Sequence, residues 1–123
     1  MIAQEDADDS EPVGFTMKTF EEFQALANKV PLSLRNNLDR INLPVIGLQE
    51  EAGRIGALLA RVSTSGRLEL TPEQRNKLHD SLSDLLWHMA LLCSETGITM
   101  QDIACHCIKQ LQERAEQLDP DQR

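Results

Sequence analysis

Aromatic residues are scarce in this sequence. Its 123 residues include no tyrosine, one tryptophan and three phenylalanines. Stacking surfaces for the bases of a nucleic acid would have to rest on those four side chains. The formal net charge of -8 also opposes contact with a phosphate backbone. We therefore expect no nucleic acid polymer among the partners of this protein.

Long apolar runs and paired cysteines are also lacking. No stretch approaches the length of a membrane span, and the first residues do not show the basic-then-apolar pattern of a secretory signal. Three cysteines, an odd number, do not make a disulfide framework. Together these observations favour a cytoplasmic protein with no membrane partner.

Cys105, His106 and Cys107 form a grouping that suggests a soft metal. Residues two apart on a helix point about 200° from each other, so these three side chains cannot all bind one ion. No second Cys/His pair completes a tetrahedral zinc site. We interpret the cysteines as packed or surface thiols.

Negative charge is concentrated at the start of the chain. Five acids fall within the first eleven residues: Glu5, Asp6, Asp8, Asp9 and Glu11. We interpret residues 1–14 as an acidic disordered tail. The hydrophobic fraction of 41% is sufficient for a core. We expect a single helical domain over residues 15–118, followed by a C-terminal tail at residues 119–123.

Apolar spacing and end signals predict an almost entirely helical chain. Three helices should begin at a threonine followed three residues later by Glu, Gln or Asp: Thr19 and Glu22, Thr71 and Gln74, Thr99 and Asp102. The first should stop near Pro31, and the second near Gly97. Asn42 should cap a further helix with Pro44 in its first turn, running to about Val62. Residues 32–41 form either a short helix or an extended connector.

The helix that follows Asn42 carries an apolar stripe at three- and four-residue steps: Leu48, Ala52, Ile55, Leu59 and Val62. Gly47, Gly53 and Gly56 in the same helix indicate either the close approach of a neighbour or simple tolerance of glycine. The helix after Thr71 is apolar around much of its circumference, which is typical of a bundle centre or a dimer seam. We expect an all-α fold, a four- to five-helix bundle that dimerises through its helices.

Three short segments carry the most specific pattern in the sequence: residues 47–53 (GLQEEAG), 82–90 (LSDLLWHMA) and 97–104 (GITMQDIA). In their order and spacing over residues 42–115 they resemble the MazG-like all-alpha nucleoside triphosphate pyrophosphohydrolases. The resemblance implies a helical bundle that forms a homodimer or homotetramer. It also implies Mg²⁺-dependent hydrolysis of a nucleoside triphosphate to the monophosphate and pyrophosphate, with Mn²⁺ as a possible substitute.

Members of that family carry E-x-x-E on one helix and E-x-x-D on the next, and these four acids bind the metal. Here Glu51 matches the first acid and Asp84 the last, while Arg54 and Ser81 stand at the other two positions. Residues three or four apart share a helix face, and Mg²⁺ prefers oxygen ligands. We therefore predict Glu51 and Asp84 as catalytic metal ligands. Glu50 and Asp80 would be auxiliary ligands.

Three basic residues are candidates for binding the substrate. Arg54 lies within the acidic motif, and guanidinium suits phosphate oxygens. Arg114 aligns with a late arginine of the family, and Lys109 lies one position from a family lysine. These residues complete the predicted substrate site.

The two lost acids support an alternative function. In it the chain is a catalytically impaired relative that binds nucleotide or acts as a dimeric helical module, with Arg54 in place of the metal and paired with Asp84. Glu50 and Arg54 could also form an ordinary salt bridge one turn apart. A third hypothesis is a helical adaptor whose acidic tail docks onto a basic partner.

Overall fold

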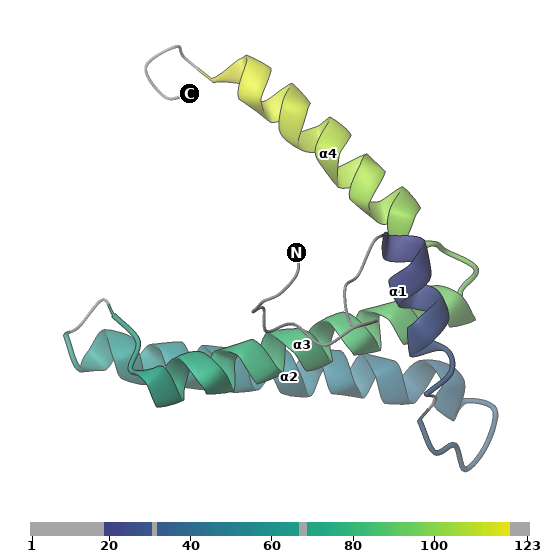
Figure 1. The fold of residues 1–123 in the computed structure, drawn as a ribbon, viewed down its shortest axis with the longest axis horizontal. Coiled ribbons are helices and arrows are strands. Elements are labelled where there is room, and N and C mark those ends of the chain that lie inside the picture. The colour runs from purple at the N-terminus through teal and green to yellow at the C-terminus, as the bar shows by residue number, and fades with distance from the viewer. Residues whose placement is uncertain (1–18, 31, 67–68, 119–123) are drawn as a thin grey trace, which may run out of the picture.

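The computed structural model describes residues 19–30, 32–66 and 69–118, drawn in colour in Figure 1. The predicted tails at residues 1–14 and 119–123 lie outside this range, as does Pro31. Four helices form the fold: α1 (Phe20–Ala27), α2 (Asp39–Thr64), α3 (Pro72–Glu95) and α4 (Met100–Gln117). The described segments contain no strand, so the prediction of an all-α chain is confirmed.

The threonine signals mark helix starts as predicted. The Thr71 hydroxyl accepts from the Gln74 backbone N–H at 3.1 Å, and the Gln74 side-chain oxygen accepts from the Thr71 N–H at 2.9 Å. The Thr99 hydroxyl caps α4 by accepting from the Asp102 N–H at 3.0 Å. Thr19 caps α1 in the same way. Each bond satisfies one N–H that has no partner within the helix.

The predicted start of α2 at Asn42 is wrong, because the helix already begins at Asp39. The Asn36 side-chain oxygen accepts from the backbone N–H groups of Leu38 and Asp39, at 2.9 and 3.3 Å. The buried Asp39 carboxylate accepts from the Arg35 N–H at 2.8 Å. These hydrogen bonds fix the start of α2 about one helical turn earlier than predicted. Residues 32–41 are therefore a loop that runs into the first residues of α2.

Helices α2 and α3 pack against each other as a long antiparallel hairpin, and α1 packs against α3 and α4 near one end of it (Figure 1). The core lies at this end. It is built from Ala27, Ala90, Cys93 and Met100, with Phe20, Phe23, Leu86, Trp87 and Met89 around them. None of the described helices combines the length and apolarity needed to cross a bilayer.

One polar side chain joins three elements at this core. The Gln24 amide donates to the Ser94 hydroxyl at 3.0 Å and to the Ile98 carbonyl at 3.1 Å. Its oxygen accepts from the Met100 N–H at 2.9 Å, at the start of α4. Gln24 therefore fixes the direction in which α4 leaves the core.

The cysteines differ sharply in exposure. Cys93 is buried in the core, and its desolvation raises the pKa of the thiol. Cys105 and Cys107 lie exposed on α4. Among the described residues no group of three or more metal-binding side chains comes together.

The apolar stripe predicted for α2 coincides only in part with the face that α2 buries. Of its five residues, Val62 is buried and Leu48 and Ile55 are half-buried, whereas Ala52 is exposed and Leu59 is 41% exposed. The other buried positions along this part of α2 are Pro44, Gly47, Glu51 and Leu58. The centre of the buried face lies about 60° around the helix axis from the centre of the predicted stripe. The outer edge of that stripe, at Ala52 and Leu59, therefore remains open to solvent in a single chain.

Helix α4 also leaves apolar side chains uncovered. It extends away from the hairpin beyond its contact with α1 (Figure 1). Ile108 is 54% exposed and Leu111 is 55% exposed. The four helices thus match the expected number, but α4 does not pack along the hairpin within one chain.

Gly47 is the glycine at which helices approach closely. A Cβ built at this position would lie 2.5 Å from three atoms of the His88 imidazole on α3. At Gly53 and Gly56 the same atom would meet nothing within 4 Å. Of the two interpretations of these glycines, close approach of a neighbour is therefore confirmed at Gly47, whereas Gly53 and Gly56 fit simple tolerance of glycine within one chain.

The Gly47→Ala substitution should destabilise the fold by about 1–3 kcal/mol, because the new methyl group overlaps the His88 ring. The matched change Gly53→Ala should stabilise it by up to about 1 kcal/mol, since alanine favours an exposed helix. Urea denaturation followed by circular dichroism measures both. Equal stability of the two variants would contradict this packing of α2 on α3.

Candidate functional site

A cavity of about 380 Å³ opens between α2 and α3. It brings together four of the residues singled out in the sequence: Glu51 and Arg54 from α2, and Asp80 and Asp84 from α3. Ser81, at the third motif position, also lines it. The remaining wall is Ala57, Leu58, Arg61 and Lys77. The two motif segments therefore face one space.

Glu51 is the buried acid of this cavity. Its side chain is 7% exposed, on the face of α2 that packs against α3. Asp84, the motif acid on α3, is exposed. Transfer of a carboxylate out of water is costly unless a positive charge or hydrogen-bond donors compensate for it. Glu51 therefore requires a partner at this position.

Arg54 is that partner. Its Nη1 atom lies 2.5 Å from Glu51 Oε2, three residues away on the same helix. The Arg54 side chain is 61% exposed, so the guanidinium reaches solvent while neutralising the buried acid. The sequence-based expectations paired Arg54 with Asp84 or with Glu50. The observed partner is Glu51, since residues three apart share a helix face.

The aspartates on α3 are not neutralised in this way. Asp80 and Asp84 lie one turn apart and face the same cavity. Neither forms an ion pair or a hydrogen bond with any residue in the described part of the chain. Two like charges at this spacing repel each other modestly. They are free to interact with a bound cation or with hydrogen-bond donors on a ligand.

Two basic residues of this cavity were missed by the sequence analysis. Arg61 lies seven residues after Arg54 on α2, and Lys77 lies seven residues before Asp84 on α3. Seven residues make almost two full helical turns, so each shares a face with the motif residue. That spacing is the signal that would have found them.

Glu50 faces a different space from Glu51. It lines a second, open cavity of about 370 Å³ together with Leu32, Ser33, Leu43, Ile46, Gly47 and His88. Adjacent residues on a helix point about 100° apart, so Glu50 and Glu51 do not converge on one ion. The structure does not bring Glu50 into the predicted auxiliary position.

Lys109 and Arg114 lie on α4, and both are exposed. Neither lines the cavity between α2 and α3. Because α4 extends away from the hairpin, the structure of one chain does not bring these two residues to the acidic motifs (Figure 1).

The charges around the cavity are mixed and equal in number. Three acids (Glu51, Asp80, Asp84) and three bases (Arg54, Arg61, Lys77) line it. As arranged, the described carboxylates do not form a group that could hold a metal ion. Guanidinium and ammonium groups suit phosphate oxygens, whereas carboxylates accept from hydroxyl and amino groups. This arrangement suits a ligand that carries both phosphates and hydrogen-bond donors.

Comparison with known proteins adds no assignment. The chain matches no protein-family model, no curated protein and no solved structure.

The Arg54→Ala substitution should destabilise the fold by about 1–3 kcal/mol, because it leaves the Glu51 carboxylate buried without a counter-charge. Adding Glu51→Gln should restore part of the loss, since a neutral amide is less costly to bury. Arg61→Ala is the matched control on the same helix, and it should change stability by less than about 0.5 kcal/mol. Urea denaturation measures all of these variants. A loss at Arg61 as large as that at Arg54 would contradict the role of the ion pair.

Proposed function

We propose that this chain is a catalytically impaired MazG-like protein that binds a nucleoside triphosphate in the cavity between α2 and α3. The observation that carries the proposal is the Glu51–Arg54 ion pair. It neutralises the buried acid of the motif and presents a guanidinium group to the cavity. The resemblance of three segments to the MazG-like family supplies the substrate class.

Arg54 can contact phosphate because most of its side chain is exposed to solvent. A guanidinium has donors in a planar fork, so Arg54 can keep one bond to Glu51 and direct others toward phosphate oxygens. The unpaired Asp80 and Asp84 can accept hydrogen bonds from hydroxyl or amino groups of the nucleoside. The cavity of about 380 Å³ falls within the usual size range of small-molecule sites.

The second candidate function is hydrolysis of the triphosphate to the monophosphate and pyrophosphate. It is favoured by the position of Glu51, Asp80 and Asp84 around one cavity. A bound Mg²⁺ or Mn²⁺ would supply Lewis acidity and charge neutralisation there. The arrangement of the described residues does not fit such an ion, because Arg54 engages Glu51 and no group of metal-binding side chains is formed. For this reason we favour binding without efficient hydrolysis.

Restoring the missing acids tests this proposal. Two acids and one arginine give the four motif positions a formal charge of -1, and glutamates in place of Arg54 and Ser81 would make it -4. The variant Arg54→Glu/Ser81→Glu should bind Mg²⁺ or Mn²⁺ with a dissociation constant of about 1 mM or tighter. Isothermal titration calorimetry should detect no such site in the native chain, which should bind nucleoside triphosphates without releasing pyrophosphate.

The control for that titration is Arg75→Glu. Arg75 is a cation of α3 that does not line the cavity, so its substitution changes charge nearby without adding a ligand. Metal binding by this control equal to that of the double variant would overturn the alignment of Arg54 and Ser81 with metal ligands. Pyrophosphate release by the native chain would favour the hydrolase instead.

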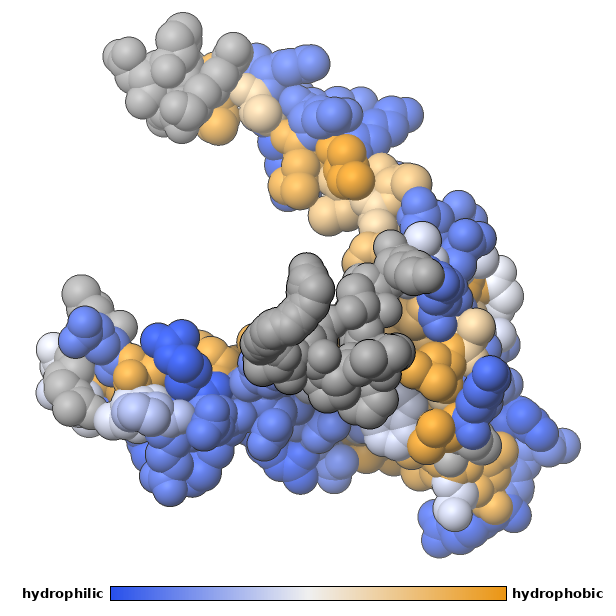
Figure 2. Space-filling view, viewed as in Figure 1, coloured by the Kyte–Doolittle hydropathy of each residue, from blue (hydrophilic) through white to orange (hydrophobic). Residues whose placement is uncertain are grey.

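The proposal includes a homodimer formed through helices. Figure 2 shows apolar side chains along α4, and the exposed stripe of α2 at Leu59 faces solvent as well. Exposed apolar faces of this kind are typical of interaction surfaces. A second copy presents the same two faces, so each copy can cover the α4 stripe of the other. A homotetramer would require a second contact of this type.

The Ile108→Lys substitution should shift the native dimer to monomer, because it places a charge in the apolar stripe of α4. Glu113 is an exposed residue of the same helix that points about 140° away from Ile108, so Glu113→Lys should leave the dimer intact. Size-exclusion chromatography with light scattering at several concentrations measures the change. A native chain that is monomeric at about 100 μM would contradict the proposed homodimer.

A further inference from the structure

Arg61 and Lys77 lie at the same end of the cavity although they belong to different helices. Arg61 lies close to the end of α2 at Thr64, and Lys77 lies close to the start of α3 at Pro72. Because the two helices pack antiparallel, these segments meet at the tip of the hairpin. Two cations from opposite walls therefore face one space.

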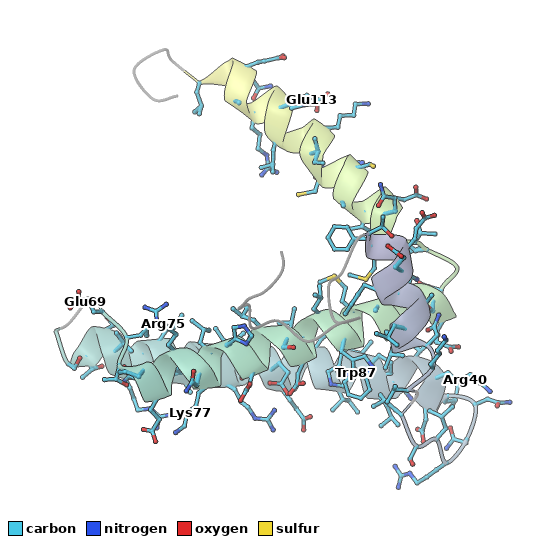
Figure 3. All side chains as sticks on the ribbon, viewed as in Figure 1. Arg40, Glu69, Arg75, Lys77, Trp87 and Glu113 are labelled. Carbon is cyan, nitrogen blue, oxygen red and sulfur yellow. The ribbon has the colours of Figure 1, made fainter. Side chains whose placement is uncertain are left out.

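These two cations are available to a ligand. The Arg54 guanidinium is engaged by Glu51, whereas Arg61 and Lys77 form no ion pair with any residue in the segments that the structure describes. Figure 3 shows Lys77 and Arg75 pointing to opposite sides of α3, so Arg75 does not share this position. Arg75 is also absent from the cavity wall.

Two of the three acids of the cavity lie toward its other end. Glu51 precedes Arg61 by ten residues on α2, which is about 15 Å along the helix axis. Asp84 follows Lys77 by seven residues on α3, which is about 10 Å in the opposite chain direction. The third acid, Asp80, is only about 4.5 Å along the axis from Lys77. The cavity thus has two cations at the hairpin tip and two acids nearer the core, with Arg54 and Asp80 between them.

We infer that Arg61 and Lys77 form an anion subsite that binds the outer phosphates of a polyphosphate chain. The chain lies along the hairpin, with its outer phosphates at the tip and its inner phosphate near Arg54. This orientation keeps the outer phosphates away from Asp84, which would repel them, and leaves Asp80 as the acid beside the polyphosphate chain. It leaves the acidic end for hydrogen-bond donors of the nucleoside. The nucleotide part of the inference rests on the proposed function, whereas the anion subsite stands on the cavity charges alone.

The subsite predicts a dependence on phosphate number. A monophosphate near Arg54 does not reach the tip, whereas a triphosphate extends toward Arg61 and Lys77. Charge-assisted hydrogen bonds to phosphate contribute about 1.5–3 kcal/mol each, which corresponds to at least about a tenfold change in affinity. Removing either cation should therefore weaken binding of the triphosphate by about tenfold and leave that of the monophosphate within about twofold.

The experiment is isothermal titration calorimetry of the full chain with inorganic tripolyphosphate, a nucleoside triphosphate and the matching monophosphate. The variants are Arg61→Gln, Lys77→Gln and the double substitution, with Arg75→Gln as the matched control. We expect about a hundredfold loss of tripolyphosphate affinity in the double variant and less than about a twofold change in the control. Circular dichroism establishes that each variant is folded. Lys77→Arg should retain binding, because it keeps the charge.

The outcomes separate this inference from the proposed function. Unchanged tripolyphosphate affinity in the folded double variant would overturn the subsite, even if the nucleotide still binds through Arg54. An equal loss in the Arg75 control would also overturn it, because only the overall charge would then matter. A native chain that binds tripolyphosphate through these cations but binds no nucleotide would support the subsite and refute the proposed function. A native chain that binds neither would refute both.

Discussion

A carboxylate buried between two helices needs a positive charge close by, and in this chain Arg54 supplies it to Glu51. The pair lies within one helix, three residues apart, with the acid buried and the base half open to solvent. This single contact allows α2 to pack an acid against α3. It also changes what the cavity can bind, since Glu51 is already neutralised and only Asp80 and Asp84 remain unpaired among the acids that line it. The stability of the fold and the charge of the cavity therefore depend on the same contact.

The geometry of the hairpin then determines how the remaining charges are distributed. Antiparallel packing places the ends of α2 and α3 together, so that Arg61 and Lys77 meet at the tip. The close approach of Gly47 to His88 fixes the other end of the same contact. A cavity with two acids nearer the core, two bases at the tip, and Arg54 and Asp80 between them follows from these two constraints. In the proposed function, the phosphates of the ligand lie toward the tip and its hydrogen-bond donors toward the core.

Much of the fold could be predicted from local signals. Threonine caps and the Thr71–Gln74 box mark helix starts because they satisfy backbone N–H groups within a few residues. The start of α2 could not be placed in this way, since Asn36 and Asp39 hold it through contacts that resemble no simple cap. The buried face of α2 was placed only in part, because its exposed edge at Ala52 and Leu59 is as apolar as a core face. Spacing within one helix does not say which of two apolar faces meets a neighbour in the same chain.

The candidate site was predictable to a similar degree. The spacing in the sequence predicted that Glu51, Arg54, Asp80 and Asp84 lie close together, because residues three or four apart share a helix face. All four line one cavity. The same reasoning failed for Glu50. This residue is adjacent to Glu51, so its side chain points about 100° away and lines another cavity. The reasoning also failed for Lys109 and Arg114, because the direction of α4 depends on Gln24 and the core contacts of Met100. The sequence did not identify the ion-pair partner of Arg54, because Glu50, Glu51 and Asp84 were all within reach. The structure identifies it as Glu51.

The central claim of the proposed function is that the Glu51–Arg54 pair takes the place of a metal ion. Electron paramagnetic resonance of Mn²⁺ added to the native chain without nucleotide tests it most directly, because bound Mn²⁺ loses the sharp signal of the free ion. The account predicts that the free-ion signal persists in full as the protein is titrated to about 1 mM, since the motif positions carry too little negative charge to hold the ion. Loss of the signal with one saturable site per chain would contradict it.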